Sequence, residues 1–98
     1  MNFSVSKEAA QWYIDEMGLE KGDYVRFFVK LYGGIPTAHP SYFLGVSVGK
    51  EGDIAIEKEV EGITFYFINQ DAWFLDEYDM QVIKEQGKEE VEFKFIES

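Results

Sequence analysis

The first clear pattern in the chain is helical. Apolar side chains recur at helical spacing over residues 7–17, at Ala10, Tyr13, Ile14 and Met17. Ser6 precedes this stretch and Gly18 follows it. A serine hydroxyl can cap the first backbone N–H groups of a helix, and a glycine can adopt the left-handed conformation that ends one. The sequence therefore predicts a helix over residues 7–17.

After residue 23 the apolar positions alternate, which is typical of strands with one buried face. The stretches with this pattern are 24–32, 42–48, a strand beginning at Ile54, 63–67, 80–84 and 91–96, and residues 2–5 could add an edge strand. Glu61-Gly62 and Gln86-Gly87 are turn pairs between strands. Asn69 could cap a short helix over 70–75. These elements predict a mainly β, α+β domain.

Composition favours one folded domain over residues 1–98. Hydrophobic residues make up 46% of the chain and aromatic residues 17%. A chain of about 100 residues with this many large apolar side chains can form a cooperative core without covalent staples. The chain has no cysteine, so disulfides and thiolate metal sites are excluded, and a reducing compartment is favoured.

The charge balance narrows the classes of partner. Nineteen carboxylates against nine cations give a formal charge of −10, and the cations are spread singly. We expect no nucleic-acid or anionic-membrane binding, because both surfaces are negatively charged. No apolar run approaches the roughly 20 residues of a membrane span, and residues 1–4 do not resemble a signal peptide, so we expect a cytoplasmic protein.

The segment from Tyr32 to Ser41 interrupts the strand pattern. It contains Gly33-Gly34, both prolines and the only histidine, His39. Exposed loops carry binding and catalytic residues more often than strands do. The glycine pair lacks the Lys-Ser/Thr ending and following helix of a phosphate-binding loop, so its expected role is a tight turn.

The order of these elements resembles the HesB/IscA family of iron–sulfur assembly proteins, the A-type carriers. The matching stretches are Val25 to Lys30, Gly33-Gly34, Ser41 to Leu44 and Val60 to Phe65. Within that family the chain is most similar to a short, cysteine-free branch of Gram-positive bacteria, the YneR-like proteins. The resemblance implies a HesB-like, β-sandwich-type fold of short strands with one N-terminal helix and one short helix.

The carriers hold iron or a cluster through three thiolates, one after the Gly-Gly loop and two in a Cys-Gly-Cys tail. The first position falls within residues 35–40 of this chain, where there is no cysteine, and the tail has no counterpart after Phe95. The resemblance therefore implies the scaffold of a carrier without its cluster ligands.

The candidate binding residues lie in this loop and on the flanking strand face: Arg26, Tyr32, Gly33, Gly34, His39 and Tyr42. His39 is a weak candidate metal ligand, since imidazole binds iron or zinc only with partners that the sequence does not reveal. The acidic run Asp71, Asp76, Glu77 and Asp79 lacks the spacing of a calcium loop and is expected to be a solvated helix end.

Two expectations concern the aromatic residues. Trp12 and Trp73 are expected to anchor the two helices in or near the core. The aromatic residues on the other face of the strands would line an apolar partner surface if that face were open, but we expect a helix or second sheet to cover them. These residues are Tyr24, Phe28, Tyr32 and Phe43.

The sequence thus favours a non-catalytic accessory or binding protein of the HesB/IscA type, related to cluster assembly but unable to hold a cluster by cysteine. No cofactor is expected, and a protein partner and a homodimer are both left open. One alternative is a metal-binding protein that uses His39 and carboxylates. The last alternative is an enzyme acting on a small molecule held between sheet and loop.

Overall fold

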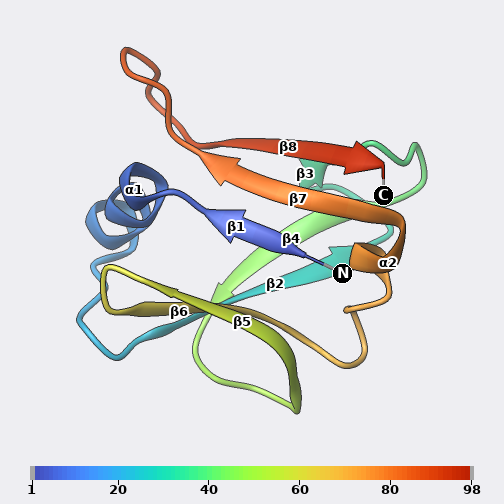
Figure 1. The fold of residues 1–98 in the computed structure, drawn as a ribbon, viewed down its shortest axis with the longest axis horizontal. Coiled ribbons are helices and arrows are strands. Elements are labelled where there is room, and N and C mark those ends of the chain that lie inside the picture. Colours follow the sequence, from blue (N-terminus) through green and yellow to red (C-terminus); the bar gives the residue numbers. More distant parts are fainter. Residues whose placement is uncertain (1, 98) are drawn as a thin grey trace.

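The computed structural model describes residues 2–97 and confirms the mainly β, α+β class (Figure 1). The strands are β1 (Phe3–Val5), β2 (Tyr24–Lys30), β3 (Ile35–Pro36), β4 (Phe43–Val48), β5 (Ile54–Val60), β6 (Ile63–Ile68), β7 (Tyr78–Ile83) and β8 (Glu92–Glu97). The helices are α1 (Lys7–Met17) and α2 (Phe74–Glu77). In these residues no helix combines the length and apolarity needed to cross a membrane.

The strands form two sheets, in the orders β1-β7-β8 and β3-β4-β2-β6-β5. The parallel pairs are β1 with β7 and β2 with β6, and the other neighbours are antiparallel. The smaller sheet lies over one face of the larger, with α1 at one end and α2 at the other (Figure 1). The predicted sandwich-type arrangement is confirmed.

Helix α1 forms where the spacing predicted it. The Ser6 side chain accepts a hydrogen bond from the Ala9 backbone N–H at 3.1 Å. Gly18 adopts a left-handed conformation (φ 63°) and donates its N–H to the Ile14 carbonyl. Both bonds satisfy backbone groups that a helix end leaves without partners. The buried residues Ala9, Ala10 and Tyr13 turn one face of the helix to the core.

Phe27 is the centre of the core between the sheets. It is fully buried on β2, where the alternating pattern placed it. Its ring centroid lies 5.8–6.5 Å from those of Phe3, Tyr13, Phe65, Phe67 and Phe93. These rings come from both sheets and from α1, so one side chain joins all the layers.

The turn predicted at Glu61-Gly62 is confirmed. Both residues have positive φ, 55° and 81°, and they connect Val60 of β5 directly to its partner Ile63 of β6. Two successive left-handed residues match the twist of the flanking strands, and glycine adopts this conformation at low cost.

Three predicted boundaries were wrong. The strand predicted over 24–32 ends at Lys30, leaving Leu31 and Tyr32 62% and 86% exposed. The loop contains a short strand, β3, because Ile35 and Pro36 pair with β4. The helix predicted over 70–75 begins only at Phe74 and has no side-chain cap.

The other face of the larger sheet is not covered by the helix or by the smaller sheet. Tyr24, Phe28 and Phe43 do not belong to the core cluster and are only partly buried. Phe28 lies across the neighbouring strand, where a Cβ on Gly45 would come within 2.3 Å of its ring. The expectation that another layer covers these rings was wrong, because both α1 and the smaller sheet pack against the Phe27 side.

Candidate functional site

The loop after β2 contains a glycine pair whose backbone conformation favours glycine. Gly33 and Gly34 have positive φ, 64° and 107°, a conformation that other residues rarely adopt. A Cβ on Gly34 would lie 2.6 Å from the Leu44 carbonyl oxygen, which is closer than van der Waals contact allows. The pair thus lets the loop turn back and pair as β3 with β4.

The rest of the loop is ordered by its own polar groups. The Thr37 hydroxyl oxygen accepts from the His39 backbone N–H at 3.1 Å and lies 2.9 Å from the Tyr42 carbonyl oxygen, to which it can donate. The His39 Nδ1 atom accepts from the Ser41 backbone N–H at 3.0 Å. Local bonds of this kind fix the conformation of a loop before any partner arrives.

Three aromatic side chains meet beside this loop and form what we call the aromatic surface: His39, Tyr42 and Trp73. The ring centroids of His39 and Tyr42 are 4.5 Å apart, and those of Tyr42 and Trp73 are 5.1 Å apart. Trp73 is 39% exposed and does not pack against the core cluster, so the expectation that it anchors a helix in or near the core was wrong, whereas Trp12 is partly buried against that cluster. Phe74, the neighbour of Trp73, is fully buried and takes that place.

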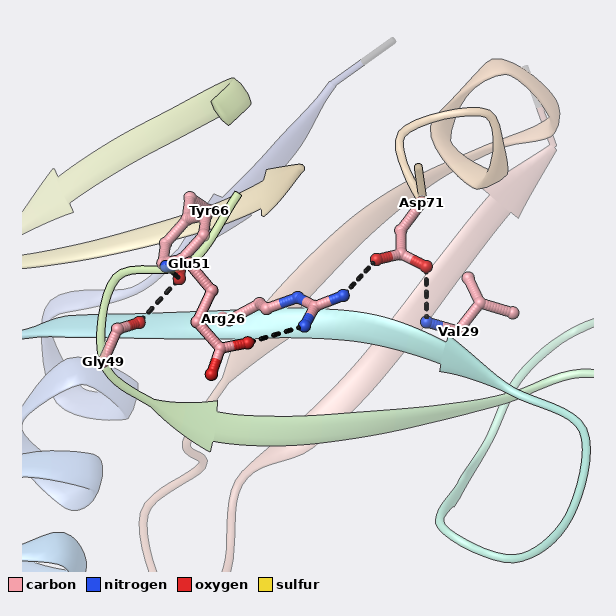
Figure 2. A network of polar contacts seen from close by, with 6 residues as sticks. All are labelled: Arg26, Val29, Gly49, Glu51, Tyr66 and Asp71. Carbon is pink, nitrogen blue, oxygen red and sulfur yellow. Dashed lines mark hydrogen bonds and ion pairs between the residues drawn. The ribbon is translucent and has the colours of Figure 1, made fainter. Parts of the chain in front are cut away.

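A buried ion pair fixes the segment that carries Trp73. Arg26 on β2 donates through Nη2 to Asp71 Oδ2 at 2.9 Å and through Nη1 to Glu51 Oε2 at 3.1 Å (Figure 2). The second carboxylate oxygen of Asp71 accepts from the Val29 backbone N–H at 3.3 Å. The Asp71 side chain is 5% exposed and that of Glu51 is 64% exposed. One guanidinium nitrogen of Arg26 therefore pairs with a buried carboxylate and the other with an exposed one.

The position of Asp71 explains why the predicted helix over 70–75 fails. The Asp71 and Ala72 N–H groups both donate to the Ile68 carbonyl at 3.0 Å, giving tight turns in place of a helix. These turns direct the Asp71 carboxylate to Arg26, 45 residues away in the sequence. The expectation that this acidic run is a solvated helix end was therefore wrong for Asp71.

Tyr66 holds the loop that supplies Glu51. Its hydroxyl donates to the Gly49 carbonyl at 2.6 Å and accepts from the Glu51 N–H at 2.8 Å (Figure 2).

The Arg26 guanidinium also lies 5.1 Å from the centre of the Phe28 ring, within range of a cation–π contact. Among residues 2–97, Arg26 Nε is the buried side-chain nitrogen that has no partner.

The structure brings together only some of the predicted site residues. His39 and Tyr42 stack directly, and Gly33 and Gly34 shape the loop that carries them. Tyr32 projects into solvent. Arg26 acts at a distance, because its partner Asp71 lies two residues before Trp73.

Sequence reasoning missed Asp71 and Trp73, which complete the site. One signal was available: Arg26 is the only arginine in the chain and stands in the middle of an apolar strand. A charged side chain at such a position needs a buried partner.

Among the described residues, the structure provides no further metal ligands beside His39. Among residues 2–97, no three His, Cys, Asp or Glu side chains lie close enough together to hold a metal ion. The Nδ1 atom of His39 already accepts the Ser41 bond, so in the neutral imidazole the proton lies on Nε2. A metal ion would have to displace either the Ser41 hydrogen bond at Nδ1 or the proton on Nε2. Metal binding at His39 stays a prediction.

Comparison with known proteins identifies the family. No family model matches the chain. Over 95 residues it is 35% identical to a protein of Bacillus subtilis (strain 168) named pyruvate dehydrogenase inhibitor, covering 97% of this chain and 99% of that protein. The chain belongs to the family of this inhibitor. The chain is also 25% identical over 95 residues to an uncharacterized protein of Staphylococcus saprophyticus, a likeness that covers 95% of this chain and 97% of that protein.

The fold of this inhibitor family is that of the HesB/IscA-like proteins. The chain is similar to the crystal structure of Escherichia coli SufA, which is involved in the biosynthesis of iron–sulfur clusters, with a TM-score of 0.57. The match covers 99% of this chain and 86% of SufA at 18% sequence identity, so it concerns the fold alone. Together with the absence of cysteine, these two likenesses confirm the predicted resemblance to the cysteine-free HesB/IscA-like branch.

Proposed function

We propose that this protein is a non-catalytic binding protein that inhibits pyruvate dehydrogenase by docking its aromatic surface against the enzyme. The observation that carries the proposal is the likeness to the Bacillus subtilis inhibitor, which extends over almost the whole of both chains. The shared region includes 99% of that inhibitor. The inhibitory surface would then lie on the shared sandwich itself.

The aromatic surface has the properties of a protein-binding site. Tyrosine and tryptophan are enriched among the residues that dominate binding energy at interfaces. Here they lose little conformational entropy on binding, because Thr37 fixes the loop and Arg26 fixes the turn that carries Trp73. The net charge of −10 would favour a positively charged docking face on the enzyme.

The role of a cluster carrier is less well supported. Soft thiolate ligands suit iron–sulfur clusters, and this chain has none. The scaffold shared with SufA would then serve to present a surface. A purely structural use of a fold is common, because function depends on the site and not on the architecture.

Truncating the aromatic surface should weaken binding to the enzyme. For Trp73→Ala and Tyr42→Ala we expect roughly 30-fold weaker binding each, the loss of about 2 kcal/mol typical of an interface anchor. Calorimetry with purified Bacillus subtilis pyruvate dehydrogenase complex gives the affinity, and NADH formation from pyruvate gives the inhibition. Ile96→Ala is the matched control, since Ile96 is a 50% exposed apolar residue on β8 outside the aromatic surface.

Two results would contradict this proposal. If the wild-type protein neither binds nor slows the enzyme, the inhibitor role is wrong for this chain. If the wild type inhibits and Ile96→Ala weakens binding as much as Trp73→Ala does, the aromatic surface is not the docking site. Circular dichroism of each variant separates loss of binding from loss of fold.

Anaerobic incubation with ferrous iron and sulfide tests the carrier role directly. We expect no stable visible chromophore after desalting, because no thiolate is present to retain a cluster. Escherichia coli SufA treated in the same way is the positive control. A stoichiometric chromophore that survives desalting would show that oxygen and nitrogen ligands suffice, and the proposal would fail.

A further inference from the structure

A cavity of about 590 Å³ lies on one side of the sandwich and is open to solvent. Helix α1, the β3–β4 edge and the segment leading into β8 surround it. The lining residues are Trp12, Tyr13, Met17, Gly34, Ile35, Pro36, Val46, Glu90, Val91, Glu92 and Phe93. None of them belongs to the aromatic surface. A volume of this size is typical of a site for a small organic molecule.

The inner wall of this cavity contains one polar group without a partner. Tyr13 is 2% exposed, and its hydroxyl has no hydrogen-bond partner among residues 2–97. Among residues 2–97, Arg26 Nε is the side-chain atom that is both fully buried and without a hydrogen-bond partner. Since the unpaired Tyr13 hydroxyl is not such an atom, it keeps some accessible surface. Tyr13 is one of the residues that line the cavity.

The Tyr13 hydroxyl is protonated over the whole physiological range. Burial raises the pKa of this phenol far above its usual value, because the charged form would lose its hydration. A neutral phenol can both donate and accept a hydrogen bond. A buried polar group normally finds a partner, so this hydroxyl points to a ligand that carries a matching polar atom.

The mouth of the cavity is acidic. Glu90 and Glu92 line it and are exposed. Glu85, Glu89 and one cation, Lys88, lie on the same hairpin and line an adjoining hollow with them, so carboxylates outnumber cations there. Trp12 bridges helix and hairpin, since its indole Nε1 donates to the Glu89 carbonyl at 2.8 Å. An aromatic face beside carboxylates suits a positively charged group.

We propose that this cavity binds a small organic amine with an apolar body, an ammonium group at one end and a hydroxyl or carbonyl at the other. The apolar body lies between Met17, Val46 and Phe93. The ammonium group lies at the mouth with Glu90 and Glu92, and the far oxygen meets the Tyr13 hydroxyl. A small anion of the same shape is excluded by the carboxylates.

Tyramine is the probe that matches these features. Titration into the ¹⁵N-labelled protein, followed by NMR, should shift the amides of the lining residues on α1, β3 and β8. We expect 2-phenylethylamine, which lacks the phenol oxygen, to bind about three- to tenfold more weakly through loss of one hydrogen bond. We expect 3-(4-hydroxyphenyl)propionate, which places a carboxylate at the mouth, to bind at least tenfold more weakly than tyramine.

Two sets of variants locate the polar contacts. Tyr13→Phe removes only the hydroxyl and should abolish the preference for tyramine over 2-phenylethylamine, with little effect on the affinity for the latter. Glu90→Gln combined with Glu92→Gln should reduce the discrimination between tyramine and the propionate. Both sets change atoms at or near the surface of the cavity, and the dispersion of the NMR spectrum shows whether the fold is kept.

Val46→Phe should fill the cavity and abolish binding. Val48→Phe is the matched control, since Val48 lies two residues further along β4 on the same side of the sheet but is 52% exposed and outside the cavity. The proposal is overturned if tyramine causes no shifts at millimolar concentration, if the shifts map away from the lining residues, or if the propionate binds as tightly as the amine. It is also overturned if Tyr13→Phe keeps the full preference for tyramine.

Discussion

The change Asp71→Asn should lower the free energy of unfolding by about 2–3 kcal/mol. The side chain keeps its size but loses the charge that neutralises Arg26 inside the protein. Removing one member of a buried pair is costly because the other charge remains away from water. Urea denaturation measures the loss, and the melting temperature should fall by roughly 10 °C or more.

Glu51→Gln is the matched control for this prediction. It removes the other carboxylate that contacts the same guanidinium, but the Glu51 side chain is 64% exposed. Exposed ion pairs contribute about 0–1 kcal/mol, so this variant should remain close to the wild type. Equal losses for Asp71→Asn and Glu51→Gln would contradict the view that burial decides the strength of the pair.

The ion pair also links stability to the proposed binding activity. Since Asp71 holds the turn that carries Trp73, Asp71→Asn should weaken binding to pyruvate dehydrogenase even at temperatures where the variant is fully folded. Glu51→Gln should not. Full retention of binding by folded Asp71→Asn would mean that the aromatic surface keeps its geometry without the pair.

Truncation of the central core residue should have a larger effect on stability. For Phe27→Ala we expect a loss of about 3–5 kcal/mol, because the change removes a fully buried ring and leaves a cavity among five other aromatic side chains. A domain of this size has a total stability of only about 5–15 kcal/mol. The variant should therefore be partly unfolded at 37 °C, as measured by circular dichroism and urea denaturation.

The adjacent residue provides the control. Phe28 has the same side chain on the same strand but projects to the other face of the sheet, where it is only partly buried. Its ring contacts Arg26 and covers Gly45, so Phe28→Ala should cost less than half as much as Phe27→Ala. A cost for Phe28→Ala as large as that for Phe27→Ala would mean that the exposed face of the sheet contributes as much to stability as the core.

Local signals in the sequence were sufficient for much of the fold. Helix α1 has its cap, its apolar spacing and its terminal glycine within thirteen consecutive residues, Ser6 to Gly18. The alternation on β2 and the turn at Glu61-Gly62 are equally local. Each of these features depends on residues near one another in the chain, so propensity and spacing predict them.

The features that sequence reasoning missed depend on distant contacts. The turns around Asp71 form because a carboxylate there meets Arg26 across the fold, and no local pattern reports that meeting. Trp73 was expected inside because tryptophan is usually largely buried. Its exposure results from the same turns, which place Phe74 in the core and leave Trp73 beside Tyr42.

The candidate loop was predicted only as an exception to the strand pattern. Its glycines, prolines and single histidine marked it as irregular. The sequence did not predict the pairing of Ile35 and Pro36 with β4 or the stacking of His39 on Tyr42. Both depend on the direction that the chain takes after Gly34. The resemblance to the HesB/IscA family was based on the order of the elements along the chain and not on a single motif.

The parallel pairing of β1 with β7 has a consequence for synthesis of the protein. Phe3 lies opposite Met80, so the smaller sheet is assembled from segments near the two ends of the chain. During translation at about 5–20 residues per second, the apolar face of α1 stays uncovered for on the order of several seconds, until the strands that pack against it have been synthesised. Such long-range pairing also slows folding. A nascent or C-terminally shortened chain therefore exposes its hydrophobic face to chaperones and proteases until residues near 80 are available.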